Sequence, residues 1–229
     1  MSTDVIVKTE LPLIPTPHIM ELLIKAKHFL EHAKMHSQTG NSFDSMIAIH
    51  SLDNSIEYLL RIIIKHLEIE EKTGKTINTA ELMGLFSEVD KFLKERTQLN
   101  GKGVGLPFEN EIRQLRVLRN NVQHGLILPI SELRSFIDYG ERFFTKVLSK
   151  VFGLTPQEIA YSTLIENGDI KEHLAKAETK IIEGQFLPAI VACRDAFELG
   201  EFILRQNSHH YNKMAVLPQL KQKSMELYW

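Results

Sequence analysis

Apolar residues recur at three- and four-residue steps along most of the chain, the spacing that places them on one face of an α-helix. A first helix is expected from His18 to about His36. Its apolar positions are Ile19, Leu22, Leu23, Ala26, Leu30 and Ala33. A second, longer helix is expected from about Phe43 to Glu70, and it is apolar on nearly all sides between Tyr58 and Ile64. Such a helix is typical of the centre of a bundle.

Three further helices are expected in the first two thirds of the chain. One runs from about Ala80 to Arg96, with Thr79 as its N-cap. The glycine-containing segment Asn100–Gly105 follows and is expected to be mobile. The next helix starts near Pro107 and ends at Gly125, a natural C-terminal cap. The last has Ser131 as its expected N-cap.

The resulting prediction is an all-α protein: an up-and-down helical bundle of four to five helices followed by a partial helical repeat. Residues 1–17 contain three prolines and are expected to form an extended arm. Residues 18–153 would form the bundle, with no convincing strand. Gly153 and Pro156 then mark a boundary, so that residues 154–229 would form an incomplete second unit.

The second unit resembles the start of the first. The run Glu57–Arg61 parallels Glu201–Arg205, and at the same offset Ala48 falls on Ala192. Residues 169–206 therefore resemble the first two helices, and too few residues follow them for three more. Either the second unit is degenerate or the chain is a fragment of a longer protein. Its exposed apolar face is expected to pack on the first unit or on another subunit.

Composition places the chain among ordinary soluble proteins. Of its 229 residues, 43% are apolar and 24% are charged, which is enough for a substantial core. No apolar run approaches the ~20 residues that span a bilayer, and the N-terminus lacks the pattern of a secretory signal. The single cysteine, Cys193, excludes an internal disulfide framework and favours a reducing, cytoplasmic location.

Charge is distributed unevenly. The formal net charge of −2 predicts no global attraction to nucleic acid. Between Lys91 and His124, however, there are seven basic and three acidic residues, which gives a local net charge of +4. This modest patch favours an anionic partner. Its candidate RNA-binding residues are Arg113, Arg116 and Lys102.

The strongest candidate for chemistry is the run from Arg119 through Asn120 to His124 at the end of an amphipathic helix. Arginine binds phosphate through a planar fork of donors, and histidine can take and give a proton near neutrality. Arg119 and His124 are five residues apart, about 140° around an ideal helix. They would share one substrate only if the helix end unwinds or a second subunit completes the site. The structural alternative is a solvated arginine and a capping histidine.

Other histidine patterns favour structural roles. The pairs Arg61/His66 and Arg205/His210 repeat the spacing by chance in less suitable surroundings. His28, His32 and His36 recur at four-residue steps, a spacing at which a pair can bind zinc. They lie opposite the apolar stripe of their helix, and no cysteine or carboxylate completes an obvious ligand set. A solvated face is therefore expected there, with neither a metal nor another cofactor.

Residues 18–152 resemble the HEPN superfamily of four- or five-helix bundles. Ribonuclease members of that family carry an arginine, usually followed by a polar residue, and then a histidine after four to six intervening residues near the end of a late helix. Arg119, Asn120 and His124 match this motif. Glu57 is similar to an acidic residue often found midway along the second helix. The second unit looks like the start of another such domain but lacks the motif.

The resemblance implies a metal-independent endoribonuclease whose composite site forms in a homodimer, where two copies of the motif helix meet. Arg119 would hold the scissile phosphate and His124 would act as general base or acid. Asn120 would orient His124 or bind the phosphate, and Glu57 would position Arg119. RNA would leave a 2′,3′-cyclic phosphate, whereas DNA and membranes are not expected partners. Such an activity would suit a toxin or a defence against phage. The alternative is a non-catalytic helical module for dimerisation or for binding a nucleotide or a protein.

Overall fold

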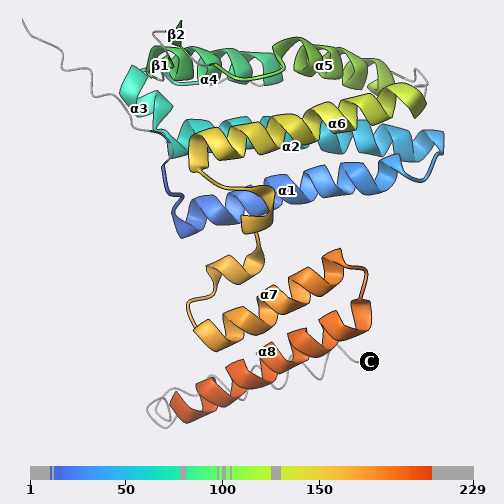
Figure 1. Ribbon diagram of the computed structural model, residues 1–229. Coiled ribbons are helices and arrows are strands. Elements are labelled where there is room, and N and C mark those ends of the chain that lie inside the picture. The colour runs from blue at the N-terminus through green and yellow to red at the C-terminus, as the bar shows by residue number, and fades with distance from the viewer. Residues whose placement is uncertain are drawn as a thin grey trace, which may run out of the picture. The chain divides into compact units, whose positions relative to one another are not determined.

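The computed structural model describes residues 11, 13–77, 81–96, 98–99, 102–103, 105–124 and 130–207 (Figure 1). The chain divides into two compact units, Met1–Ala160 and Tyr161–Trp229. Within the described ranges the protein has eight α-helices, and the paired strands are two segments of two residues each. The predicted all-α class is therefore confirmed.

The first unit is organised around helix α2. Its elements are α1 (Pro17–Ser37), α2 (Ser42–His66), α3 (Ile69–Thr73), α4 (Leu82–Arg96), β1 (Gln98–Leu99), β2 (Lys102–Gly103), α5 (Glu109–Gln123) and α6 (Ile130–Val147), followed by a π-helical turn (Leu148–Phe152) and a 3-10 turn (Pro156–Glu158). Helix α2 contacts α1, α4, α5 and α6. The predicted central position of this helix is confirmed, because an apolar surface on nearly all sides can be buried only among neighbours on all sides.

The second helix is shorter than its hydrophobic pattern predicts. A single helix was expected to continue to Glu70, but α2 ends at His66 and Glu68 adopts the left-handed conformation at φ 53°. The short helix α3 starts immediately afterwards. Leu67 is 0% and Ile69 1% exposed. In a continuous helix two residues at this spacing point in directions about 160° apart, so the break allows both side chains to be buried.

Two further expectations need correction. No strand was expected before residue 153, yet β1 and β2 pair as an antiparallel hairpin, with Leu99 opposite Lys102. The residues between the strands in the sequence are Asn100-Gly101, a dipeptide that favours two-residue hairpin turns. Ser131 is not an N-cap, because α6 already begins at Ile130. The expected caps Thr79 and Gly125 lie outside the described residues.

The arm before α1 is attached to the body at Leu13. Its backbone N–H donates a hydrogen bond to the Val151 carbonyl oxygen (3.0 Å), and its own carbonyl oxygen lies 3.2 Å from Nε2 of His66. Thr16 then caps α1, since its hydroxyl oxygen accepts the Ile19 N–H at 3.3 Å. The contacts of Leu13 therefore hold the segment that leads into the first turn of α1.

The second unit contains a helical hairpin. A 3-10 turn (Tyr161–Leu164) precedes α7 (Gly168–Ile182) and α8 (Phe186–Asn207), and the two helices pack on each other. The unit begins later than the expected boundary at Gly153, because Ile159 is 1% exposed and its carbonyl oxygen accepts a hydrogen bond from Nζ of Lys27 (2.9 Å).

Residues of α8 and their sequence counterparts in α2 have similar surroundings. Ala48 and its counterpart Ala192 are both buried. Glu57 pairs with Arg61 at 2.9 Å, and the counterpart pair Glu201–Arg205 is closed at 2.5 Å. Helix α8 nevertheless keeps many large apolar side chains exposed: Phe186, Leu187, Ile190, Val191, Phe197, Phe202 and Leu204.

Candidate functional site

The charged centre of the first unit joins α2 and α5 at Asp53. This carboxylate is 0% exposed, and its Oδ2 accepts a hydrogen bond from Nη1 of Arg116 at 2.5 Å. The Arg116 side chain is only 19% exposed. A buried carboxylate needs such a partner, because leaving a charge unpaired in the protein interior costs several kcal/mol. The pair therefore fixes the position of α5 against α2.

Arg119 lies one turn further along α5 and approaches the same carboxylate. Its Nε is 3.8 Å from Oδ2 of Asp53, and its side chain is 25% exposed. Its Nη1 donates to the side-chain oxygens of Asn120 (3.1 Å) and Gln123 (2.6 Å). Among the described residues, neither Nε of Arg119 nor Oδ1 of Asp53 has a hydrogen-bond partner. Both atoms are buried, so this part of the guanidinium group lies against the Asp53 carboxylate and away from solvent.

Glu57 does not take the place expected for it. Its Oε1 accepts hydrogen bonds from Arg61 on the same helix, and its Oε2 is 3.9 Å from Nη1 of Arg116. The carboxylate recorded near Arg119 is that of Asp53, one turn earlier on α2. An acidic residue of the second helix therefore does lie near Arg119, but it is Asp53, whereas Glu57 lies near Arg61 and Arg116.

His50 belongs to the same polar face of α2. Burial lowers its pKa, and the positive charge of Arg119 lowers the pKa further. His50 is consequently a neutral imidazole near pH 7, able to accept a proton. For Asp53, burial raises the pKa, and the charges of Arg116 and Arg119 offset this only in part.

His124 lies at the C-terminal end of α5. His124 is exposed and forms the C-cap of α5, with its backbone N–H directed at the carbonyl oxygens of Asn120 (3.2 Å) and Asn121 (3.1 Å). No side-chain hydrogen bond between His124 and Arg119 is found in the described part of the chain. Their angular separation of about 140° on the helix predicts that one copy does not direct both motif side chains at one substrate.

The other expected RNA-binding residues are spread over the same region. Arg116 is committed to Asp53, as described above. Arg113 is exposed and pairs with Glu109 on its own helix at 3.0 Å. The backbone of Lys102 lies in β2, and its side chain is outside the described atoms. Arg113 is thus the more accessible of the two arginines.

Asp53 and His50 were missed by sequence reasoning. The signal was present: His50, Asp53 and Glu57 follow one another at three- and four-residue steps, and so share one face of a helix that is otherwise strongly apolar. A carboxylate on the most buried helix of a bundle implies a cation on a neighbouring helix. Which helix supplies that cation depends on the packing of α5.

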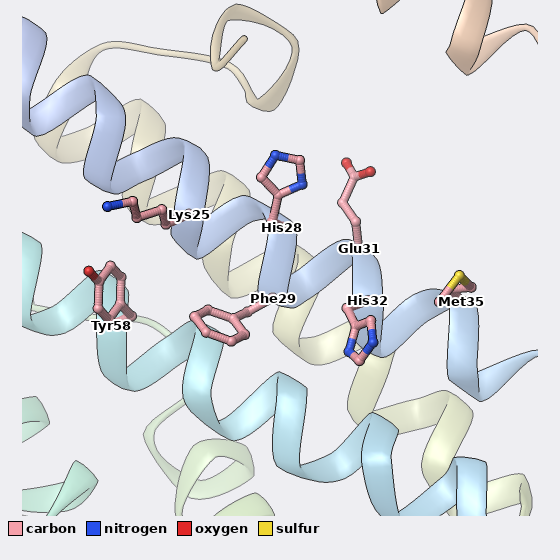
Figure 2. Close-up of a pocket in the computed structure, with 7 residues that line it drawn as sticks. All are labelled: Lys25, His28, Phe29, Glu31, His32, Met35 and Tyr58. Carbon is pink, nitrogen blue, oxygen red and sulfur yellow. The ribbon is translucent and has the colours of Figure 1, made fainter. Parts of the chain in front are cut away.

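A pocket of 810 Å³ lies elsewhere in the first unit. It is lined by Lys25, His28, Phe29, Glu31, His32, Met35 and Tyr58 (Figure 2). Phe29 meets Tyr58 edge to face, with ring centroids 6.1 Å apart. In Figure 2, His28 and Glu31 project from one side of α1, whereas Phe29 and His32 project from the side that faces α2.

Beside this pocket, a chain of polar contacts connects α1 to α2. Nδ1 of His32 is 2.9 Å from Oγ of Ser51, and Nε2 of His32 is 3.1 Å from Nε2 of His36. Nδ1 of His36 in turn is 2.6 Å from Oδ1 of Asp44. The expected solvated face therefore holds an ordered pair of histidines. Over the described residues, no group of three or more His, Cys, Asp or Glu side chains is arranged to hold a metal ion.

No family model, curated protein or solved structure matches this chain. Among the described helices, none is both long and apolar enough to cross a membrane. The local geometry and the motif of α5 are therefore what indicate a function.

Proposed function

We propose that this protein is a metal-independent endoribonuclease of the HEPN type, with a composite site formed when the α5 helices of two copies meet. The observation that carries the proposal is the last part of α5, which carries Asn120 and the partly exposed Arg119 and ends at the exposed C-cap His124. An arginine and a histidine provide phosphate binding and proton transfer, which are sufficient for attack by a ribose 2′-hydroxyl.

The anchoring of Arg119 supports this role. Asp53 lies 3.8 Å from its Nε, and Asn120 and Gln123 hold its Nη1. A guanidinium group held in this way loses less freedom when it binds a phosphate than a fully mobile one does. Asn120 thus accepts a hydrogen bond from Arg119 in the free protein.

Two histidines are available for proton transfer. His124, exposed at the C-cap, takes the proton of the 2′-hydroxyl or gives one to the leaving 5′-oxygen, as the motif implies. Burial, and to a smaller extent the charge of Arg119, lowers the pKa of His50, which keeps its imidazole neutral near pH 7. Cleavage needs one base and one acid, and the second copy's His124 or His50 supplies the other group.

Cleavage of a mixed RNA pool in the presence of EDTA tests the proposal. The wild type should produce 2′,3′-cyclic phosphate ends, and Arg119→Ala and His124→Ala should each reduce the rate by at least about 100-fold. Arg134→Ala, an exposed arginine on α6, is the matched control and should cleave normally. DNA of the same sequence should remain intact, because it lacks the 2′-hydroxyl.

The oligomeric state decides whether the composite site exists. A wild type that is folded and dimeric but leaves RNA intact would overturn the ribonuclease proposal, and so would equal cleavage by wild type and both α5 variants. A monomer at micromolar concentration would contradict the composite site.

A second candidate function is a non-catalytic helical module for dimerisation or for nucleotide or protein binding. The observation in its favour is that Asp53 pairs with both Arg116 and Arg119. This pairing gives the two arginines a structural role that needs no substrate. If it is their main role, Arg119→Ala lowers the free energy of unfolding, whereas His124→Ala changes neither stability nor RNA binding.

A further inference from the structure

The histidine pair on α1 has the geometry of a metal site. His32 and His36 are four residues apart, so they lie on one face of the helix. Their Nε2 atoms converge to 3.1 Å. Two imidazole nitrogens bound to one tetrahedral zinc ion at ~2.05 Å are about 3.3 Å apart. The two nitrogens are therefore already close to the separation that a shared ion requires.

We propose that Nε2 of His32 and Nε2 of His36 together bind one divalent transition-metal ion, for which Zn²⁺ is the natural probe. Imidazole nitrogen suits Zn²⁺, Cu²⁺ and Ni²⁺, whereas Mg²⁺ and Ca²⁺ prefer oxygen. This site lies on α1, away from the motif of α5, and does not depend on the proposed ribonuclease activity.

The second nitrogen of each ring is already held by a group on α2. Nδ1 of His36 donates to the Asp44 carboxylate at 2.6 Å, and both side chains are largely shielded, at 19% and 16% exposure. Nδ1 of His32 meets the hydroxyl of Ser51, a residue that is 6% exposed. Metal-binding histidines usually have such a partner on the second nitrogen, because it fixes the tautomer and the orientation of the ring.

The hydrogen bonds among Ser51, His32, His36 and Asp44 can all be formed with both histidines neutral. Without an ion, Ser51 donates to Nδ1 of His32, Nε2–H of His32 donates to Nε2 of His36, and Nδ1–H of His36 donates to Asp44. When an ion binds, the proton of His32 leaves Nε2 and is carried on Nδ1, and the Ser51 oxygen accepts it once the hydroxyl hydrogen of Ser51 has turned away. Both Nε2 lone pairs are then available, and the pair releases no net proton.

The pair leaves coordination positions open. Two protein ligands complete only half of a tetrahedral shell, so water or a ligand group fills the rest. His28 is no part of the set, because it projects from the other side of α1 in Figure 2. His32 also lines the 810 Å³ pocket, so the open positions adjoin a cavity with the aromatic rings of Phe29 and Tyr58.

Calorimetric titration of the full chain with Zn²⁺ tests the proposal, using protein that carries no polyhistidine tag and has been freed of metal with a chelator that is then removed. The wild type should bind Zn²⁺ saturably, whereas Mg²⁺ should give no heat of binding. His32→Ala and His36→Ala should each weaken the tight site by at least about tenfold. The matched control is His28→Ala, an exposed histidine of the same helix, and this variant should bind like the wild type.

Asp44→Asn separates a metal site from an ordinary histidine contact. It keeps the size of the side chain but removes the charge beside His36, and it should weaken Zn²⁺ binding by about 10- to 100-fold. Circular dichroism verifies that each variant is folded. The proposal is overturned if the folded wild type shows no saturable Zn²⁺ binding, or if His32→Ala and His36→Ala bind as tightly as His28→Ala. RNA cleavage in EDTA is measured separately, so failure of either proposal leaves the other standing.

Discussion

Replacing Arg116 by methionine should destabilise the protein strongly, because it leaves Asp53 buried without its hydrogen-bonded cation. Methionine keeps most of the apolar stem of the side chain and removes the charge. Breaking a buried ion pair on one side costs about 3–5 kcal/mol. We expect the lower end, about 3 kcal/mol, since Arg119 remains 3.8 Å from the carboxylate.

Urea unfolding followed by far-ultraviolet circular dichroism measures this loss. With a slope of about 2 kcal/mol per molar urea, a loss of about 3 kcal/mol lowers the midpoint by about 1.5 M. Arg113→Met is the matched control on the same helix. Its pair with Glu109 is more than half exposed on both sides, so this change should cost no more than about 0.5 kcal/mol.

The pH dependence distinguishes a buried charge from lost packing. Burial holds the native-state pKa of Asp53 above its ordinary value of 3.8, and removal of Arg116 raises this pKa further. A raised native-state pKa means that the folded protein binds the proton more tightly than the unfolded chain, so stability falls as the pH rises through the interval above 3.8. Arg116→Met should therefore be closer to the wild type near pH 5 than near pH 7.

Adding Asp53→Asn to Arg116→Met should restore much of the lost stability, because the double variant no longer buries an unpaired charge. A loss below about 0.5 kcal/mol in Arg116→Met near pH 7 would refute the reasoning. The same conclusion would follow from a loss that neither varies with pH nor responds to the second substitution.

Three further perturbations address the packing, the capping and the histidines. In Gly140→Ala the new Cβ would lie 2.4 Å from Cδ1 of Leu52, which is 0% exposed, so thermal unfolding should show a loss of about 1–3 kcal/mol; an unchanged Tm would contradict this packing. Thr16→Ala removes the N-cap of α1 and should cost about 1 kcal/mol in urea unfolding, while Thr16→Ser should retain most of it. Burial lowers the pKa of His50 and of His66 below 6.5. The unfolded chain therefore takes up protons at a higher pH than the folded protein, and the free energy of unfolding should fall as the pH drops below 6.5, less steeply in His66→Gln. An identical slope in that variant would count against a lowered pKa of His66.

Helix periodicity determined the class of the fold and the central position of α2. Apolar residues on nearly all sides between Tyr58 and Ile64 require neighbours on all sides, whatever those neighbours are. The break in the helix at Glu68 was not predicted from the sequence, because it arises from the need to bury both Leu67 and Ile69. A pattern along one helix contains no information about such an external constraint.

The residue types of the candidate site were also visible in the sequence. The spacing of Arg119 and His124, about 140° around the helix, predicts that one copy does not direct both side chains at one substrate, and no hydrogen bond between these side chains is found among the described residues. The identity of the carboxylate beside Arg119 was not determined, since Asp53 and Glu57 lie on the same face of α2 one turn apart. The way in which α5 packs on α2 decides that Asp53 is nearer.

The histidines of α1 show the same division. Their four-residue spacing placed His32 and His36 on one face, and the lack of a further ligand nearby in the sequence favoured a solvated surface over a metal site. Their partners, Asp44 and Ser51, come from the neighbouring helix. Periodicity along the chain determines which side chains share a face, because that depends on backbone geometry alone. Only the packing of one helix on another determines which groups meet across it.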